Sequence, residues 1–152
     1  MIKVRMASQE DIPQIIEFQK LMAIETEELS LDDIKINKGV TSVFDDPEKG
    51  FYIVAESENQ IAASMMITPE WSDWRNGYFL WIQSLFVTHS FRKQGVFSKM
   101  YQYIKQTVVN SELFLGLRLY VEENNDTAMD VYTNVGMSRS HYKMFEWIDN
   151  SK

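Results

Sequence analysis

At residues 2–6, hydrophobic and polar residues alternate, which predicts a strand. In the rest of the first third of the chain, hydrophobic residues recur at helical spacing. A first amphipathic helix is expected to start near Ser8 and Asp11 and to run to about Met22. A second helix is expected to begin near Ser30. It should stop before Pro47, because the residue preceding a proline avoids the helical region.

From Gly50 onward, shorter β-rich segments replace the helical spacing. Residues 51–55 and 60–68 predict two strands of a hairpin. A polar and aromatic loop is expected at residues 69–77, ahead of a strongly apolar strand at residues 78–87. These three strands are expected to form an antiparallel run.

Helices and strands alternate again in the last part of the chain. A helix is expected to end near Val109, followed by a strand at residues 113–121. Asn124 and Asn125 then predict the cap of a short helix, and a last strand is expected at about residues 140–148. Together the elements predict an α/β fold with a mixed sheet.

Composition limits the class of protein. With 152 residues, 45% of them hydrophobic, the chain is expected to form a single domain over residues 1–152. It has no cysteine, and its two histidines are too few for a metal cluster on their own, so no metal is expected. The first residues have neither the apolar run of a signal peptide nor the length of a membrane span. We therefore expect a soluble, cytoplasmic protein without a membrane partner.

Charge is unevenly distributed along the sequence. The formal net charge of −7 argues against a nucleic-acid partner, because phosphate backbones are bound through clustered lysines and arginines. Acidic residues gather before the second predicted helix, and Glu25 and Glu28 are the candidates for binding a cationic substrate. A solvated acidic loop is the alternative interpretation.

The segment from Leu85 to Tyr101 joins the apolar strand directly to a helix through a turn that contains Arg92 and Gly95. Backbone N–H groups at a helix start can hold a phosphate without a dedicated side chain. Gly95 would let the backbone turn sharply or approach a ligand closely. The alternative is an ordinary turn that needs glycine only for its geometry.

Two motifs resemble those of the GNAT N-acetyltransferases. The turn Arg92-Lys93-Gln94-Gly95-Val96-Phe97 resembles the family's Arg-x-x-Gly-x-Gly/Ala turn. The segment Asn125-x-x-Ala128-x-x-x-Tyr132-x-x-x-Gly136-Met137 resembles its second motif. The order of the expected elements also fits over essentially the whole chain. The resemblance implies a GNAT-like, mostly antiparallel central sheet with splayed central strands, flanked by helices.

The resemblance also implies the reaction, which is transfer of an acetyl group from acetyl-coenzyme A to a primary amine of a small molecule or peptide by direct attack. A backbone N–H near Phe86 or Val87 is the expected oxyanion donor. The expected cofactor-binding residues are Phe86, Val87, Arg92, Lys93, Gln94, Gly95, Val96, Phe97, Ser98, Asn125 and Ala128. Phe97 stands where the family usually has glycine or alanine, and its ring is expected to be buried.

Acetyl transfer needs a general acid and a general base. Tyr132 matches the family's tyrosine, which serves as general acid, and an aromatic core residue is the alternative. Residues 81–84 offer no carboxylate, so the candidates for the general base are Glu70, which ranks first, Asp73, Glu25 and Glu28. The alternative for Glu70 and Asp73 is a structural role in which they pair with Arg75.

Trp71 and Trp74 lie in the predicted loop, where a core would not place them. They could line the acceptor site, because indole faces attract cations. Alternatively, they could form a homodimer contact, because aromatic residues are enriched in interfaces. A different class of function, a non-catalytic coenzyme A binding or protein-interaction module, is suggested by Gln83, Ser84 and Phe97. A P-loop nucleotide enzyme is excluded because the Gly-Lys-Ser/Thr ending is missing.

Overall fold

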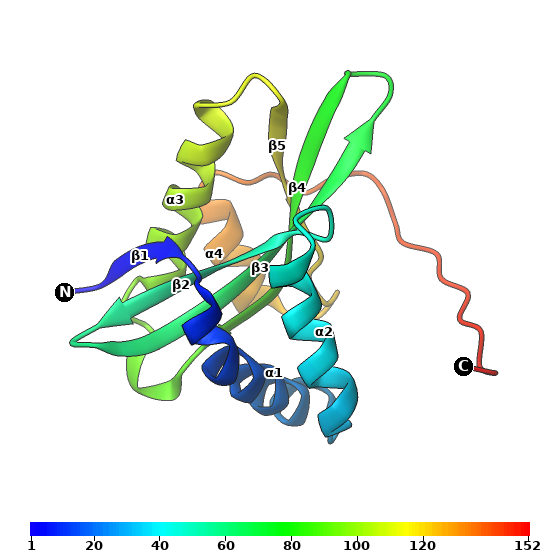
Figure 1. The fold of residues 1–152 in the computed structure, drawn as a ribbon. Helices are drawn as coiled ribbons and strands as arrows, with labels where there is room; N and C mark the ends of the chain where they lie inside the picture. The colour runs from blue at the N-terminus through cyan, green and yellow to red at the C-terminus, as the bar shows by residue number, and fades with distance from the viewer. The chain divides into compact units, whose positions relative to one another are not determined.

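A five-stranded sheet with the strand order β1-β2-β3-β4-β5 forms the centre of the fold (Figure 1). The strands are β1 (Lys3–Met6), β2 (Phe51–Ser57), β3 (Gln60–Ser72), β4 (Gly77–Val87) and β5 (Phe114–Leu119). Each neighbouring pair from β1 to β4 is antiparallel, and β5 runs parallel to β4. The predicted mixed, mostly antiparallel sheet is therefore confirmed.

Four α-helices accompany the sheet. They are α1 (Ile12–Glu27), α2 (Asp33–Asp45), α3 (Val96–Val109) and α4 (Asp126–Asn134), and two 3-10 turns, η1 (Gln9–Asp11) and η2 (His89–Phe91), precede α1 and α3. None of the helices combines the length and the apolar composition that a membrane span requires.

The computed structural model describes residues 1–152 and divides them into two compact units. The first, Met1–Tyr120, contains the sheet, α1, α2 and α3, and the second, Val121–Lys152, contains α4. The expectation of a single domain over residues 1–152 stays a prediction.

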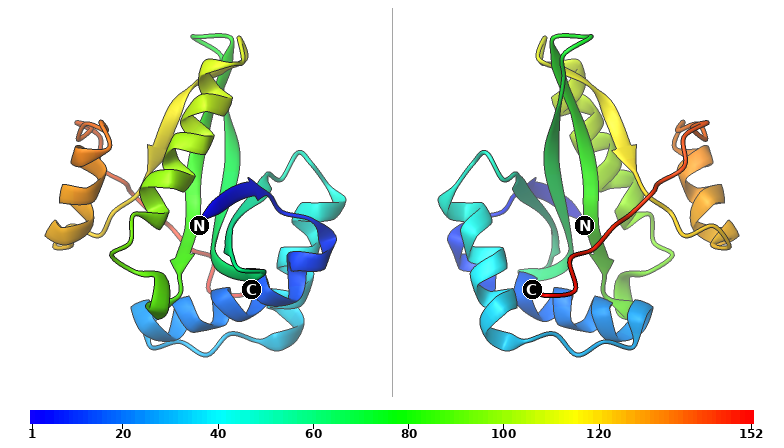
Figure 2. Two further views of the ribbon diagram at one scale, coloured as in Figure 1. Left: turned by 90° about the vertical axis from the view of Figure 1, so that its left-hand side faces the viewer. Right: turned by 90° about the vertical axis from the view of Figure 1, so that its right-hand side faces the viewer.

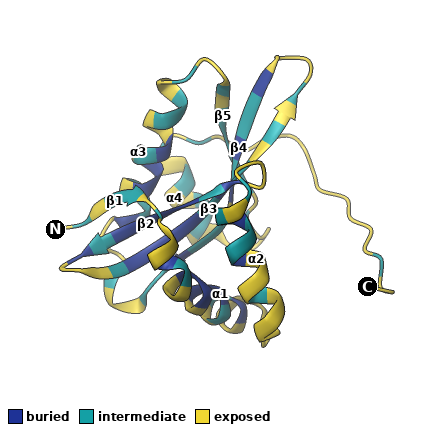
Figure 3. Ribbon diagram, viewed as in Figure 1, coloured by how far each residue is buried: buried dark blue, intermediate teal, exposed yellow.

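The core of the first unit lies on both faces of β2. Ile15 and Ile16 of α1 join Val40 and Val43 of α2 in a cluster with Tyr52 and Val54. Because side chains alternate along a strand, the intervening Ile53 and Ala55 point to the other face, and both are 0% exposed. Buried positions accordingly lie on the strands and on the helix sides that face them (Figure 3).

Both helices at the start of the chain differ in extent from the prediction. α1 continues beyond Met22 to Glu27. The predicted start of α2 at Ser30 is wrong: Asp32 caps the helix, since its Oδ1 accepts a hydrogen bond from the Lys35 N–H at 2.8 Å. Both residues are good capping types, and only the backbone path decides which one is used.

The loop predicted at residues 69–77 is mostly strand. β3 continues to Ser72 and β4 begins at Gly77, so that only residues 73–76 connect them. Pro69 is tolerated because β2 pairs with β3 only as far as Ile67, which leaves β3 with a partner on one side where the proline lies.

The prediction of a strand at residues 140–148 is wrong, because this segment of the second unit forms neither a helix nor a strand. The sequence there has the composition of a strand. A composition gives a preference, but a strand also requires a neighbour that accepts and donates its backbone hydrogen bonds.

Candidate functional site

The central strands β4 and β5 separate halfway along β4. Their pairing runs from Tyr78 with Phe114 to Ile82 with Leu119 and then stops. β4 nevertheless continues beside β3 as far as Val87. Figure 2 shows the two strands together at one end and apart at the other. The predicted splay is thus confirmed, and it leaves one edge of β4 without a strand beside it.

A bulge lies at the point of separation. On β3, Ile67 faces Ile82 and the preceding Met66 faces Ser84, so Gln83 is an extra residue in β4. Its side-chain amide donates from Nε2 to Oγ1 of Thr68 at 3.0 Å. The bulge marks where β4 turns from a strand paired on both sides to one paired on a single side.

The alternation of the β4 backbone decides which N–H groups face the opening. The Thr88 N–H donates to the Ala62 carbonyl of β3 at 2.9 Å. Since successive residues of an antiparallel strand point to opposite sides, the Phe86 N–H also faces β3, whereas those of Leu85 and Val87 face the open edge. Of the two residues named as oxyanion donors, only Val87 has its N–H on the open side.

The turn after β4 leads straight into α3. Lys93 and Gly95 have positive φ angles of 61° and 73°, and α3 starts at Val96. No side chain caps this helix, and its first intrahelical bond runs from the Lys99 N–H to the Gly95 carbonyl at 3.1 Å. A Cβ at Gly95 would meet nothing within 4 Å, so within the chain the glycine serves the backbone angle and not space.

Phe97 follows one residue into α3. Its ring lies 6.0 Å from the Tyr101 ring, centroid to centroid, and the residue is half-buried. The expected full burial is therefore only partly met. The buried side of this helix is formed by Val96, Met100 and Ile104 with Tyr101.

Arg92 connects the turn to α1. Its Nε donates to the Val87 carbonyl at 2.8 Å and its Nη2 to Oε2 of Glu25 at 2.7 Å. The other Glu25 oxygen lies 3.0 Å from Nε2 of His89. The Arg92 guanidinium holds the pKa of the Glu25 carboxyl below its ordinary value. Thus Glu25, predicted for the substrate, and Arg92, predicted for the cofactor, form one ion pair.

Glu28 does not join this ion pair. It follows α1 as an exposed residue with a left-handed φ of 51°. The structure therefore separates the two acidic residues that the sequence had grouped.

Glu70 lies on β3 and contacts β4 and β5. Its Oε2 accepts from Nη1 of Arg118 at 2.7 Å and from Nε1 of Trp81 at 3.2 Å. The anticipated pairing with Arg75 is wrong, because Arg75 instead contacts Ser72. The partner is on β5, and no local sequence signal connects residues so far apart.

Aromatic rings surround this ion pair. The Trp81 ring stacks on Tyr120 at 4.5 Å, and the Arg118 guanidinium carbon lies 3.5 Å from the centre of the Phe79 ring. Trp81, Arg118 and Tyr120 were not candidates in the sequence. The alternation of side chains along β4 and β5 was the only available sequence signal. It shows which residues of one strand share a face, but not which face of β4 lies next to which face of β5.

Trp71 and Trp74 lie at the β3–β4 hairpin. Trp71 is 51% exposed and contacts the Tyr78 ring edge-on, whereas Trp74 is 88% exposed. Their roles in an acceptor site or in a homodimer contact both stay predictions.

The second motif lies in the second unit, where α4 carries it. Oδ1 of Asn125 accepts from the Ala128 N–H at 3.1 Å, so the predicted capping is confirmed. Gly136 has a φ of 97°, as expected after a helix end. Tyr132 is half-buried, and burial raises the pKa of its phenol above the ordinary value.

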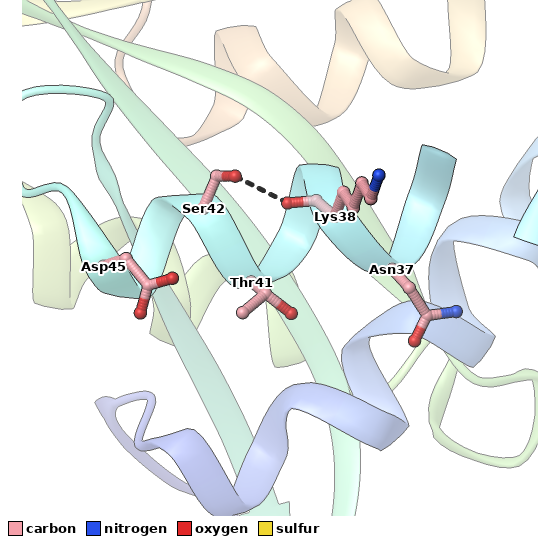
Figure 4. A pocket seen from close by; sticks show the side chains of 5 residues that line it. All are labelled: Asn37, Lys38, Thr41, Ser42 and Asp45. Carbon is pink, nitrogen blue, oxygen red and sulfur yellow. Dashed lines mark hydrogen bonds between the residues drawn. The ribbon is translucent and has the colours of Figure 1, made fainter. Parts of the chain in front are cut away.

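A shallow hollow lies along α2, and none of these residues lines it (Figure 4). Its lining side chains are Asn37, Lys38, Thr41, Ser42 and Asp45. They come from one helix and none was predicted in a site. No group of three or more histidine, aspartate or glutamate side chains could hold a metal ion.

Comparison with solved structures gives similar chains over nearly the whole length. A possible acetyltransferase from Clostridium difficile 630 is 39% identical, with 98% of each chain covered and a TM-score of 0.91. An aminoglycoside acetyltransferase from an uncultured soil metagenomic sample, in complex with sisomicin, is 16% identical, with coverage of 98% of this chain and 97% of that chain and a TM-score of 0.82.

A third structure, AAC(6')-Iy in complex with the bisubstrate analogue CoA-S-monomethyl-acetylneamine, is 10% identical, covers 98% and 99% of the two chains and has a TM-score of 0.81. At such identities the last two show the fold alone. No curated protein matches the sequence. A family model, described as Acetyltransferase (GNAT) family, matches residues 12–137. The chain therefore belongs to the GNAT acetyltransferase family.

Proposed function

We propose that this protein transfers an acetyl group from acetyl-coenzyme A to a primary amine of a small molecule or peptide. The observation that carries the proposal is the open edge of β4 beyond Ile82, followed by the Gly95 turn and the uncapped start of α3. Membership of the GNAT family supports acyl transfer as the reaction class.

The residues at the start of α3 fit the cosubstrate. Acetyl-coenzyme A supplies the acetyl group as a thioester and carries a pyrophosphate. Backbone N–H groups from about Gln94 to Ser98 lie at a helix start that no side chain caps, where negative charge is stabilised by typically ~0.3–1 kcal/mol. Lys93 adds positive charge to the same turn, and so does Arg92, whose charge is partly compensated by Glu25. In the second motif, Asn125 and Ala128 are the residues proposed to contact the pantetheine arm.

The open edge of β4 supplies the oxyanion donor in this proposal. The Val87 N–H faces the opening, where it would donate to the thioester carbonyl as negative charge develops on that oxygen. A preorganised donor of this kind typically contributes about 10²–10³ in rate. Arg92 bonds the carbonyl of the same residue and so helps to fix the end of the strand.

Two residues are proposed to move protons. Glu70 is the proposed general base, and its Oε1 makes no hydrogen bond, since both donors bind Oε2. Because Glu70 pairs with Phe79, eight residues before Val87 on β4, the proton of the acceptor ammonium would reach it through water. The free amine then attacks, a C–N bond forms, and as the C–S bond breaks the nitrogen releases its second proton to solvent, which later restores the Tyr132 phenol. Tyr132 donates its proton to the leaving thiolate, and burial keeps that phenol protonated beyond its ordinary range.

The names of the similar structures support the amine class. One is an aminoglycoside acetyltransferase in complex with sisomicin. The family match from residue 12 to residue 137 crosses from the first unit into the second, which supports the proposal of one domain over residues 1–152.

A thiol-release assay with acetyl-coenzyme A and a panel of amines tests the function. The proposal expects acetylation of at least one amine and a higher thermal midpoint with acetyl-coenzyme A. The second candidate, a non-catalytic coenzyme A binding or interaction module, is favoured by Gln83 and Ser84 at the opening of the strands, where no carboxylate stands. It would be supported if the cosubstrate raises the midpoint but no amine is acetylated.

A further inference from the structure

The strand β5 lies at one edge of the sheet, with β4 on one side and no strand on the other. Its sequence is apolar apart from Arg118, which pairs with Glu70, yet none of its residues is buried. The opposite edge strand, β1, is only four residues long and carries Lys3 and Arg5, charges that disfavour pairing with another chain. Because β5 lacks such protection, its free edge is suited to accept a further strand.

The segment 140–148 of the second unit also lacks a partner. The backbone of residues 143–148 makes no hydrogen bond within the chain. Its large apolar side chains, which are 60–96% exposed (Figure 3), are Tyr142, Met144, Phe145, Trp147 and Ile148. In an extended chain these residues would lie on both sides of the backbone, a distribution typical of a strand inside a sheet.

The second unit as a whole has no core of its own. None of the residues from Val121 to Lys152 is buried, and those of α4 are included. A short segment that buries no apolar side chain gains too little free energy to offset the entropy lost when it becomes ordered. The apolar segment 140–148 is therefore expected to pack against another surface.

We propose that residues 140–148 add as a strand to the free edge of β5 in a second copy of the chain, and that the second copy returns the same contact. Each chain carries both an unpaired edge and an unpaired segment with the composition of a strand. Two copies related by a two-fold axis would satisfy both at once through backbone hydrogen bonds. This interaction surface does not depend on the proposed acetyl transfer.

The exchanged side chains are large enough for a stable dimer. Two segments contribute Tyr142, Phe145 and Trp147 twice, and each aromatic side chain buries ~150–250 Å². These side chains alone approach the ~1,200–2,000 Å² that stable interfaces bury, before the surface of the receiving strand is counted.

Charge favours an antiparallel direction for the added strand. Glu122 and Glu123 follow β5, and Arg139 and Lys143 lie at the start of the segment. In antiparallel pairing the start of the segment lies next to the end of β5, so that these opposite charges meet. Parallel pairing would instead bring Glu146 toward the two glutamates.

Light scattering of the full-length protein tests the proposal, and the expected mass is twice that of one chain. Trp147→Lys should raise the dissociation constant of the dimer about 30-fold or more, since aromatic residues at the centre of an interface carry much of its affinity. Phe145→Lys should act in the same direction. Both side chains are exposed within the chain, so both variants should fold.

Trp74→Lys is the matched control, because Trp74 is as exposed as Trp147, at 88% and 86%, but belongs to the β3–β4 hairpin. It should leave the dissociation constant within about twofold. Hydrogen exchange locates the contact: residues 114–119 and 140–148 should exchange slowly in the dimer and faster in Trp147→Lys, whereas α2 should not change.

Three results would overturn the proposal. The first is a protein that stays monomeric at high concentration, including one whose segment pairs with β5 of its own chain. The second is a dimer that Trp147→Lys and Phe145→Lys leave intact, whether or not Trp74→Lys dissociates it. The third is a dimer in which residues 140–148 exchange as fast as an unfolded chain.

Discussion

Arg92 and Glu25 form an ion pair, with Nη2 donating to Oε2 at 2.7 Å, although 67 residues separate them in the sequence. The same arginine donates from Nε to the Val87 carbonyl at the end of β4. One side chain thus joins the last part of α1, the end of β4 and the turn before α3. The proposed pyrophosphate site and the proposed oxyanion donor are connected through this contact.

Removing each charge of this ion pair should change coenzyme A binding in opposite directions. Arg92→Gln leaves the Glu25 carboxylate without its arginine next to an anionic ligand and should weaken binding about two- to fivefold. Glu25→Gln leaves Arg92 uncompensated and should strengthen binding by up to a similar factor. Titration calorimetry at low and high salt measures both, and the effects should shrink with salt.

Glu17→Gln is the control for this experiment, since it removes a carboxylate from α1 that pairs with Lys20. If Arg92→Gln and Glu25→Gln both weaken binding to the same extent, the ion pair acts by holding the turn and not through its charge.

Replacing Gly95 separates a turn glycine from one that a phosphate approaches. Its φ is 73° and a Cβ would meet nothing, so Gly95→Asn should cost roughly 1 kcal/mol or less, because asparagine tolerates left-handed angles. Acetyl-coenzyme A affinity should fall by more than about tenfold, or ~1.4 kcal/mol, if the phosphate needs that space.

Gly136→Asn is the matched control for Gly95, with a φ of 97° and open space at the Cβ. Chemical denaturation and calorimetry give the two quantities. If Gly95→Asn loses no more binding free energy for acetyl-coenzyme A than free energy of unfolding, Gly95 serves only the geometry of the turn and not the approach of a phosphate.

Tyr132→Phe tests the proposed general acid. Turnover should fall by about 10²–10⁴, while the dissociation constant of acetyl-coenzyme A should change less than about twofold. Because burial raises the pKa of the Tyr132 phenol, the alkaline limb set by this group should lie above the ordinary range near ~10. Steady-state kinetics across alkaline pH measures both.

Tyr142→Phe, in the same unit and at a 75% exposed position, is the control for the loss of a hydroxyl. Full turnover in Tyr132→Phe would remove the acid role.

Stability should decline at alkaline pH through Tyr52. Burial raises its pKa to about 12, above ~10 in the unfolded chain, so the folded form binds this proton more tightly. The contribution is complete below about pH 10 and is lost as pH rises toward 12, amounting to roughly 2–3 kcal/mol.

Denaturant unfolding of the wild type and of Tyr52→Phe, at about pH 9 and about pH 11, measures this effect. The variant keeps the ring that stacks on Phe44 at 5.7 Å and should lose less stability between the two conditions. Parallel losses in both proteins would contradict the role of this tyrosine.

The local pattern predicted every α-helix and strand that forms, but not all of their limits, and it predicted one strand that does not form. Alternation and helical spacing located every strand of the sheet and every helix, because these periods follow from backbone geometry. They failed at residues 69–72, where an open edge accommodates a proline inside β3, and at residues 140–148, which have the composition of a strand but form none. Both outcomes depend on neighbours that a local pattern does not contain.

The α/β class follows from local sequence patterns, and so does the family resemblance of the Arg92–Phe97 and Asn125–Met137 motifs, which the family match confirms. Such features are local, since a turn that needs a positive φ selects glycine and a helix start selects a capping residue. By contrast, the pairing of Arg92 with Glu25, the pairing of Glu70 with Arg118 and the direction of the Val87 N–H toward the opening depend on how the chain packs. These contacts join distant segments, and the packing of helices on a twisted sheet brings their side chains together.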